Sequence, residues 1–490
     1  MKFRFNATTN ATTNATKFCL KNQALLLAFA LAFSSGAQAA DDKELSQIRD
    51  EIKQMRTAYE SRMQALEQRL VEAQAKNEKL QAQVDTKLST PSTTAASSPN
   101  KAKGKAGMSN EFNPAIALNL TGTLANLSQD PESYKIQGFM PTGGEIGPGQ
   151  RGFSLGESEL SFMATIDPHF SGQLTFALAP EGGAEVEEAL IETRDLSNGL
   201  KIKAGRFLSG IGYINQQHAH AWDFVDVPLA YQAFFGGQYK REGAQIKWLA
   251  PIDRFLEIGM EVGNGGSFPG TPRNKNGFAD SAVFAHLGDD LGDSASWRLG
   301  LSWLRNKAQA RTYQDVDGVS GLDVENSFEG RSRTVVLDGI FKWAPNGNSK
   351  QTNLKLMGEY FQRQSDGTLS HTTADTGSQV GSYSSRQTGW YAQGIYQFMP
   401  QWRVGLRHER LSSGSQNIGL VDSGALSTES FPLLSSYAPR KTSIMFDFMP
   451  SEFSRLRLQF ARDQSQPGRV DNQIFLQYNM SLGAHPAHAF

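Results

Sequence analysis

Cysteine is almost absent from this chain. Cys19 is the single cysteine among 490 residues, and it lies in the segment that we expect to be removed as a signal peptide. A mature chain without a thiol cannot form a disulfide, bind a metal through sulfur or use cysteine as a nucleophile. The chain also lacks the H-E-x-x-H motif of zinc proteases and the Walker A loop. No catalytic constellation is evident, and we expect a protein that is not an enzyme.

Long apolar runs are missing as well. A short one spans residues 24–33, after Lys17 and Lys21 and before Ala37-Gln38-Ala39. A basic start, a short apolar run and an A-x-A site predict a secretory signal peptide over residues 1–39. A retained membrane anchor is the alternative, although the run is too short to span a bilayer as a helix. No later stretch approaches the length of a transmembrane helix, which excludes a helical membrane protein.

Positive charge is not in excess either. The formal charge is −1 for the whole chain and about −7 for residues 106–490. Because no basic domain is present, we expect no nucleic-acid partner.

Residues 41–88 carry a helical repeat. Its apolar positions follow spacings of three and four with one stutter, which predicts a heptad seam at Leu45, Ile48, Ile52, Met55, Tyr59, Met63, Leu66, Leu70, Ala73, Asn77, Leu80 and Val84. We predict a self-associating coiled coil, the alternative being a lone amphipathic helix. Residues 89–111 are rich in Ser, Thr, Pro, Lys and Gly, and they predict a flexible linker.

From residue 112 to residue 490 the apolar period changes to two. In the last such stretch, Leu476 and Tyr478 alternate with Gln477 and Asn479, so each strand would have one apolar and one polar face. This pattern predicts an all-β transmembrane barrel of about 16 antiparallel strands. The strand candidates are 114–127, 152–167, 170–180, 185–195, 200–208, 242–250, 254–264, 279–288, 295–308, 333–344, 353–364, 384–399, 402–413, 440–450, 454–464 and 470–483.

A soluble β-sandwich would alternate in the same way, and three features favour the membrane barrel over it. Most candidates have the length that a tilted span of the hydrocarbon core requires. The polar faces carry Arg, Glu and Gln, which suits an aqueous lumen. The final residue, Phe490, is in phase with Tyr478, and a terminal aromatic resembles the signal that the barrel-assembly machinery recognises.

The segments between strand candidates differ in length. Long polar segments predict extracellular loops at 265–278, 312–332, 366–383 and 414–438, whereas short turns such as 167–169 predict the periplasmic end. Segment 209–241 is long and aromatic, and it is too apolar for a solvated loop. We expect it to fold into the lumen and constrict it.

Two runs resemble a known family. Residues 185–192 (Glu-Val-Glu-Glu-Ala-Leu-Ile-Glu) and 200–207 (Leu-Lys-Ile-Lys-Ala-Gly-Arg-Phe) are similar to the phosphate-selective porin O/P family. That resemblance implies a sixteen-stranded homotrimeric porin in outer-membrane lipid, in some members with an N-terminal coiled coil. Residues 217–224 and 483–490 more narrowly resemble a subgroup labelled zinc-regulated TonB-dependent outer-membrane receptors.

Charged residues on the polar faces are candidates for lining the pore. They are Lys201, Lys203, Arg206, Glu187, Glu188, Arg403, Arg407, Arg455 and Arg457. The basic members could replace the hydration of a phosphate ion, or all could simply solvate a wide pore. The negative charge of the barrel favours the second interpretation.

His218 and His220 are two residues apart, with Asp223 close by. Imidazole and carboxylate ligands suit Zn²⁺, so these three residues form a candidate metal site. Aromatic packing or interface contacts are the alternative, and no other cofactor is expected.

These observations together predict an outer-membrane porin for passive diffusion of small hydrophilic solutes or ions, with a possible link to zinc or phosphate supply. The coiled coil would lie in the periplasm and could contact the cell wall. The alternatives are a gated zinc-uptake receptor, a sugar porin with an N-terminal coiled coil, and a tether in which the barrel is only an anchor.

Overall fold

A computed structural model describes residues 114–143, 146–178, 183–272, 274–375 and 377–483. The chain divides into two compact units, Met1–Gly107 and Met108–Phe490, and all described residues belong to the second. The predicted signal peptide (1–39), coiled coil (41–88), linker (89–111) and terminal Phe490 lie outside the described residues.

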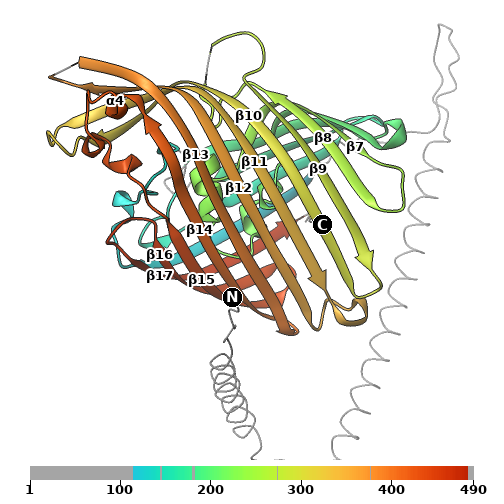
Figure 1. Cartoon of the computed structure of the whole chain (residues 1–490). Coiled ribbons are helices and arrows are strands. Elements are labelled where there is room, and N and C mark those ends of the chain that lie inside the picture. The colour runs from blue at the N-terminus through green and yellow to red at the C-terminus, as the bar shows by residue number, and fades with distance from the viewer. Residues whose placement is uncertain (1–113, 144–145, 179–182, 273, 376, 484–490) are drawn as a thin grey trace, which may run out of the picture. The chain divides into compact units, whose positions relative to one another are not determined.

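The second unit is one closed antiparallel sheet (Figure 1). Strands that follow one another in sequence pair, except that β2 and β3 both pair with β1, and β1 closes the ring by pairing with β17. The strands are β1 (Ala115–Leu127), β2 (Gly152–Ser154), β3 (Ser158–Thr165), β4 (Phe170–Leu178), β5 (Ala184–Thr193), β6 (Leu200–Leu208), β7 (Lys240–Leu249), β8 (Phe255–Gly263), β9 (Asp280–Leu291), β10 (Ala295–Val316), β11 (Asp323–Trp343), β12 (Asn353–Thr373), β13 (Gly377–Met399), β14 (Trp402–Ile418), β15 (Arg440–Ser451), β16 (Ser454–Gln464) and β17 (Asp471–Gly483).

The barrel has sixteen strand positions although seventeen strands are labelled. Strands β2 and β3 both pair with β1, β2 with residues 123–125 and β3 with residues 115–119. They are therefore two halves of one interrupted strand. The predicted barrel of about 16 antiparallel strands is confirmed, and each strand candidate overlaps an observed strand.

The distribution of polarity is the reverse of that in a soluble protein. Along β17, Ile474, Leu476 and Tyr478 are between 42% and 46% exposed on the outer face, while Gln473 and Gln477 are buried inside. Other strands repeat this pattern, as with exposed Leu406 beside buried Arg407. A soluble β-sandwich would expose the polar face instead, so an apolar exterior indicates contact with lipid.

The two ends of the barrel differ. Short turns join the strands at one end, for instance residues 166–169 and 452–453, and most of the longer connections lie at the other end. Strands β10 to β13 have 21 to 23 residues each and extend past their neighbours at the long-loop end. The predicted loops 312–332 and 366–383 are thus wrong in large part. Polar residues continue the ladder there because backbone pairing between adjacent strands does not require apolar side chains.

Helices are short and lie between strands. They are the 3-10 turns η1 (Pro131–Ser133), η2 (Ser197–Gly199), η3 (Ile214–Gln216), η4 (Ala219–Ala221), η5 (Pro345–Gly347), η6 (Thr428–Ser430) and η7 (Pro432–Leu434), and the α-helices α3 (Leu229–Phe235) and α4 (Gly419–Asp422). Within the described ranges, no helix has the length and apolar character needed to cross a membrane.

Candidate functional site

The connection between β6 and β7, residues 209–239, folds into the barrel (Figure 1). We call it the inward segment. Helix α3 is fully buried and packs against β12, β13 and β14. It ends where Gly236 adopts a left-handed φ of 71° and donates to Gln232 O. The predicted fold of this segment into the lumen is confirmed.

The two ends of the inward segment are joined by one buried amide. Asn215 Nδ2 donates to Ser209 O at 2.8 Å and to Tyr239 O at 3.0 Å, and Tyr239 N donates to Asn215 Oδ1. The side chain is 0% exposed. These three hydrogen bonds hold the two ends of the inward segment close together.

The inward segment reaches the opposite wall through two aspartates. Asp223 pairs with Lys355 at 2.5 Å and with Arg403 at 3.4 Å. Asp226 pairs with Arg407 at 2.8 Å and with Lys441 at 2.6 Å. Strands β6 and β14 stand half a circumference apart in the ring, so the segment crosses the full width of the lumen.

These pairs also set the charge state of the two aspartates. Burial alone would raise the pKa of each carboxyl, but the attached cations outweigh burial and lower it below its usual 3.8. The main cations are Lys355 for Asp223 and Lys441 for Asp226. Both aspartates are therefore ionised at neutral pH.

A buried carboxylate also holds the inward segment by its backbone. Glu359 Oε1 accepts from Tyr213 N at 3.2 Å and from Ile214 N at 3.0 Å. The hydroxyls of Tyr231 and Tyr391 donate to the same carboxylate at 2.8 and 2.7 Å. Two of these four donors are backbone N–H groups that would otherwise be buried without a partner.

The predicted basic pore residues divide into two groups. Arg403, Arg407, Arg455 and Arg457 face inward on β14 and β16, where they bind the inward segment or neighbouring carboxylates. Lys201 and Lys203 also face inward, near the short-turn end, and lie 2.5 and 3.9 Å from Glu192. The structure therefore places these six side chains beside counter-charges or carbonyl oxygens rather than leaving them free for a passing anion.

Arg206 does not face the lumen. It pairs across the sheet with Glu242, and its Nη2 lies 2.6 Å from Glu242 Oε1 on the outer face. Both side chains are more than 40% exposed. The prediction that Arg206 lines the pore is wrong because it is three residues from Lys203, and an odd spacing on a strand reverses the face.

At strands β3 and β5, which we call the near wall, the inward segment contacts a cluster of histidines and glutamates. His218 Nδ1 lies 3.1 Å from Glu159 Oε2 and 3.3 Å from Glu187 Oε2, and its Nε2 lies 3.1 Å from Glu188 Oε2. His220 Nδ1 lies 3.1 Å from Glu159 Oε1, and the two imidazole rings stack at 5.8 Å. We call these five residues the His–Glu cluster.

The composition of this cluster corrects the predicted metal site. His218 and His220 do lie together, but His218 caps η4 and His220 lies within it, so neither is on a strand. Asp223 is not with them, because Lys355 and Arg403 hold it at the far wall. Glu187 and Glu188, predicted only as pore-lining, belong to the cluster, and Glu159 completes it.

Adjacent glutamates can both face inward because β5 contains a β-bulge. Thr175 pairs with Glu188 and Phe176 pairs with Val186, which leaves Glu187 as the extra residue. A bulge aims two consecutive side chains toward the same face of a sheet. Both carboxylates therefore enter the lumen side by side.

The three glutamates also shift the pKa of His218. Burial alone would lower the pKa of His218, but its contacts with Glu159, Glu187 and Glu188 outweigh burial and raise it well above 6.5. A protonated His218 between three carboxylates is thus one way in which the negative charge of this cluster is offset.

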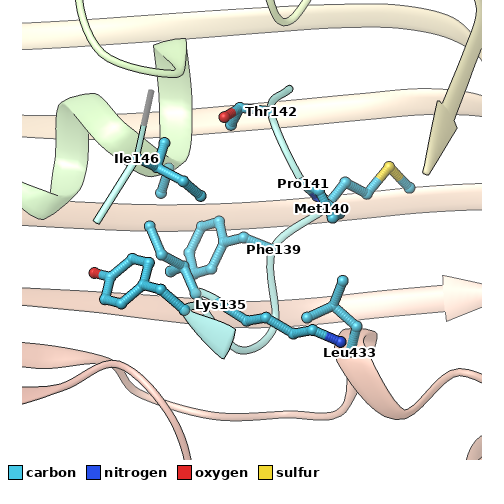
Figure 2. Close-up of a pocket in the computed structure, with 10 residues that line it drawn as sticks. Lys135, Phe139, Met140, Pro141, Thr142, Ile146 and Leu433 are labelled. Atoms are coloured by element: carbon cyan, nitrogen blue, oxygen red, sulfur yellow. The ribbon is translucent and has the colours of Figure 1, made fainter. Parts of the chain in front are cut away.

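A small cavity at the long-loop end is less suited to binding a solute. Its volume is about 40 Å³, and it is lined by residues such as Phe139, Met140 and Leu433 (Figure 2). Ligand pockets usually enclose about 300 Å³ or more. This cavity has room for water molecules only.

Comparisons with known proteins leave the family open. No family model matches the chain. An uncharacterised protein of Aquifex aeolicus is 29% identical over 357 residues, which cover 70% of this chain and 71% of that protein.

Outer-membrane proteins are among the solved structures to which the chain is similar. A loop-deletion form of OmpT from Vibrio cholerae is 11% identical with a TM-score of 0.48, over 76% of this chain and 99% of that one. The channel DcaP of Acinetobacter baumannii is 12% identical with a TM-score of 0.44, over 77% and 100%. An anion-selective porin from Comamonas acidovorans is 11% identical with a TM-score of 0.45, over 76% and 99%. At these sequence identities and TM-scores, the three structures establish no function. The resemblance to the porin O/P family and its zinc-regulated subgroup stays a prediction.

Proposed function

We propose that this protein is an outer-membrane channel through which small hydrophilic solutes or ions diffuse passively. The observation that carries the proposal is the reversed polarity of the closed barrel, with apolar side chains exposed outside and polar ones inside. Such a barrel is stable only where lipid surrounds it, and its polar interior suits water. The short-turn end would face the periplasm and the long-loop end the outside.

The inward segment would set the size limit of the channel. It crosses the lumen and is fixed at both walls, by Asp223 and Asp226 on one side and by the His–Glu cluster on the other. A fixed crossing segment narrows a barrel without gating it.

Ion pairing within the lumen argues for weak selectivity. Arg403, Arg407 and Lys441 each pair with a carboxylate, and Lys247 lies 3.0 Å from Glu257 near the short-turn end. Paired charges present little net field to a passing ion. We therefore favour a general channel over a phosphate-selective one.

The proposal extends to assembly. Three copies in outer-membrane lipid, inserted by the barrel-assembly machinery, would form the functional unit. The coiled coil predicted at residues 41–88 would lie in the periplasm, where it could reinforce trimerisation or contact the cell wall. Cross-linking of the purified protein would test whether it is a trimer. Cross-linking of a variant lacking residues 41–107 would test whether the coiled coil reinforces trimerisation.

Planar-bilayer conductance tests the channel itself. We expect steady single-channel conductance and a reversal potential near zero in a salt gradient, with little effect of added phosphate. A gated zinc receptor would show no steady conductance, and a sugar porin would be blocked by oligosaccharide. A purified protein that stays soluble without detergent and migrates identically in gels before and after boiling would overturn the proposal.

If the barrel were only an anchor for a tether, deletion of residues 41–107 would damage envelope integrity and leave solute permeability unchanged. If the barrel is a channel, solute uptake should fall in cells that lack the whole protein, because permeability depends on the barrel. Solute uptake by cells that carry the deletion, compared with cells that lack the whole protein, separates the two.

A further inference from the structure

The His–Glu cluster has the geometry of a metal site in which one ring nitrogen binds the ion. Glu188 Oε2 lies 3.1 Å from His218 Nε2, and Glu188 also accepts from Gln173 Nε2 and Leu208 N. A carboxylate so oriented holds the proton on Nε2 and turns the lone pair of Nδ1 toward the other side of the ring.

On that side, Nδ1 faces two more carboxylates. Glu159 Oε2 lies at 3.1 Å and Glu187 Oε2 at 3.3 Å, and their side chains are 1% and 0% exposed. Nδ1 and the two carboxylate oxygens all present lone pairs, so they repel one another unless a positive charge lies between them. Ligands of a tetrahedral Zn²⁺ stand about 3.4 Å apart when the bonds are about 2.1 Å, so the two measured distances suit an ion.

The same three residues leave one acceptor without a good partner. Glu159 Oε2 is buried and forms no hydrogen bond of acceptable geometry within the described part of the chain. Glu159 Oε1, by contrast, contacts His220 Nδ1 at 3.1 Å, which orients the carboxylate. His218 Nδ1 lies 3.1 Å away, but its hydrogen bond goes to Glu187 Oε2. A buried anionic oxygen without a hydrogen bond is costly, and a metal ion at this point would remove the cost.

The charge in the cluster is also negative. Three carboxylates face one ion-paired lysine, since Lys240 Nζ lies 3.2 Å from Glu187 Oε1. With both imidazoles neutral, a divalent cation would balance the remaining charge. Nitrogen and oxygen ligands suit Zn²⁺ better than Mg²⁺ or Ca²⁺, which prefer oxygen alone.

We propose that Glu159 Oε2, Glu187 Oε2 and His218 Nδ1 bind a Zn²⁺ ion, with Glu188 and His220 orienting the ligands. The three ligands come from β3, β5 and the inward segment. The ion therefore fastens the inward segment to the near wall, opposite the aspartate pairs. His218 is 21% exposed, so the site opens to the lumen and its fourth position takes water. Zinc binding at this site does not require that the barrel conducts.

Zinc binding to the purified full-length protein in detergent tests the proposal. After EDTA treatment and dialysis, Zn²⁺ is titrated into protein in which His485 and His488 are replaced by glutamine, because these two histidines could bind zinc independently. We expect one tight site per chain, at least tenfold weaker in Glu187→Gln and His218→Gln. The orienting change Glu188→Gln should weaken it about 10–100-fold.

His286→Gln is the matched control. His286 is buried on the inner face and lies 3.1 Å from Glu257, outside the cluster, so zinc affinity should not change. X-ray absorption of the zinc-loaded protein should show nitrogen and oxygen neighbours with one imidazole. All variants are first checked for the gel shift on boiling that marks a folded barrel. The absence of a tight site in the parent protein, or equal affinity in Glu187→Gln and the control, would overturn the assignment whatever the conductance shows.

Discussion

Asp226 anchors the inward segment to the far wall, and its replacement should lower the free energy of unfolding by a measurable amount. Lys441 Nζ lies 2.6 Å from Asp226 Oδ2, and the two side chains are only 1% and 10% exposed. Two unit charges at that distance attract by about 6 kcal/mol at an effective dielectric constant of 20. Desolvation offsets much of this attraction, yet loss of one partner from a buried pair costs about 3–5 kcal/mol.

Neighbouring charges reduce the expected loss. Without Asp226, Lys441 keeps Asp463 at 3.6 Å and Arg407 keeps Glu409 at 2.8 Å. We therefore expect Asp226→Asn and Lys441→Met each to lower the free energy of unfolding by about 2–4 kcal/mol. The double variant should lose less than the sum, with a coupling energy of about 2 kcal/mol.

Urea titration of the protein in lipid vesicles measures all four free energies of unfolding. The control cycle uses Arg254 and Asp289, whose side chains are 69% and 34% exposed at 3.0 Å. An exposed pair contributes at most about 1 kcal/mol, so Arg254→Met and Asp289→Asn should be nearly additive. A coupling between Asp226 and Lys441 that is no larger than the control value would refute the anchoring role.

Three further outcomes follow from the same geometry. Because the pKa of Asp226 is lowered in the folded protein, its stabilising effect is present above about pH 4 and is lost as the pH falls further, so acid unfolding followed by tryptophan fluorescence should be less steep in Asp226→Asn. Glu359→Gln replaces one acceptor oxygen with a donor that faces other donors, which should lower the free energy of unfolding by about 1–3 kcal/mol. Proteolysis within residues 209–239 should become faster, and an unchanged rate of cleavage would count against the role of Glu359. Ile246→Arg places a charge on the lipid face and should destabilise the barrel by about 2–4 kcal/mol, whereas Lys247→Arg on the adjacent inner position should be nearly neutral; equal effects in vesicle unfolding would contradict the assignment of the two faces.

The alternation of residue types was enough to place sixteen strands and assign their faces, although it did not show how far β10 to β13 extend at the long-loop end. A two-residue period is a local property, so residues such as Leu476 and Gln477 could be assigned to opposite faces without knowledge of their neighbours. The sequence also located the inward segment, because a long aromatic connection is poorly suited to solvent. The same periodicity would have excluded Arg206 from the lumen, had its spacing from Lys203 been followed.

Which residues meet could not be read from local patterns. Asp223 lies five residues from His218, yet it pairs with Lys355 and Arg403 across the barrel. Glu159 joins the His–Glu cluster from another strand, and a β-bulge brings Glu187 alongside Glu188. These contacts depend on how a closed ring folds distant strands around a crossing segment, and partners so far apart in the chain leave no local pattern.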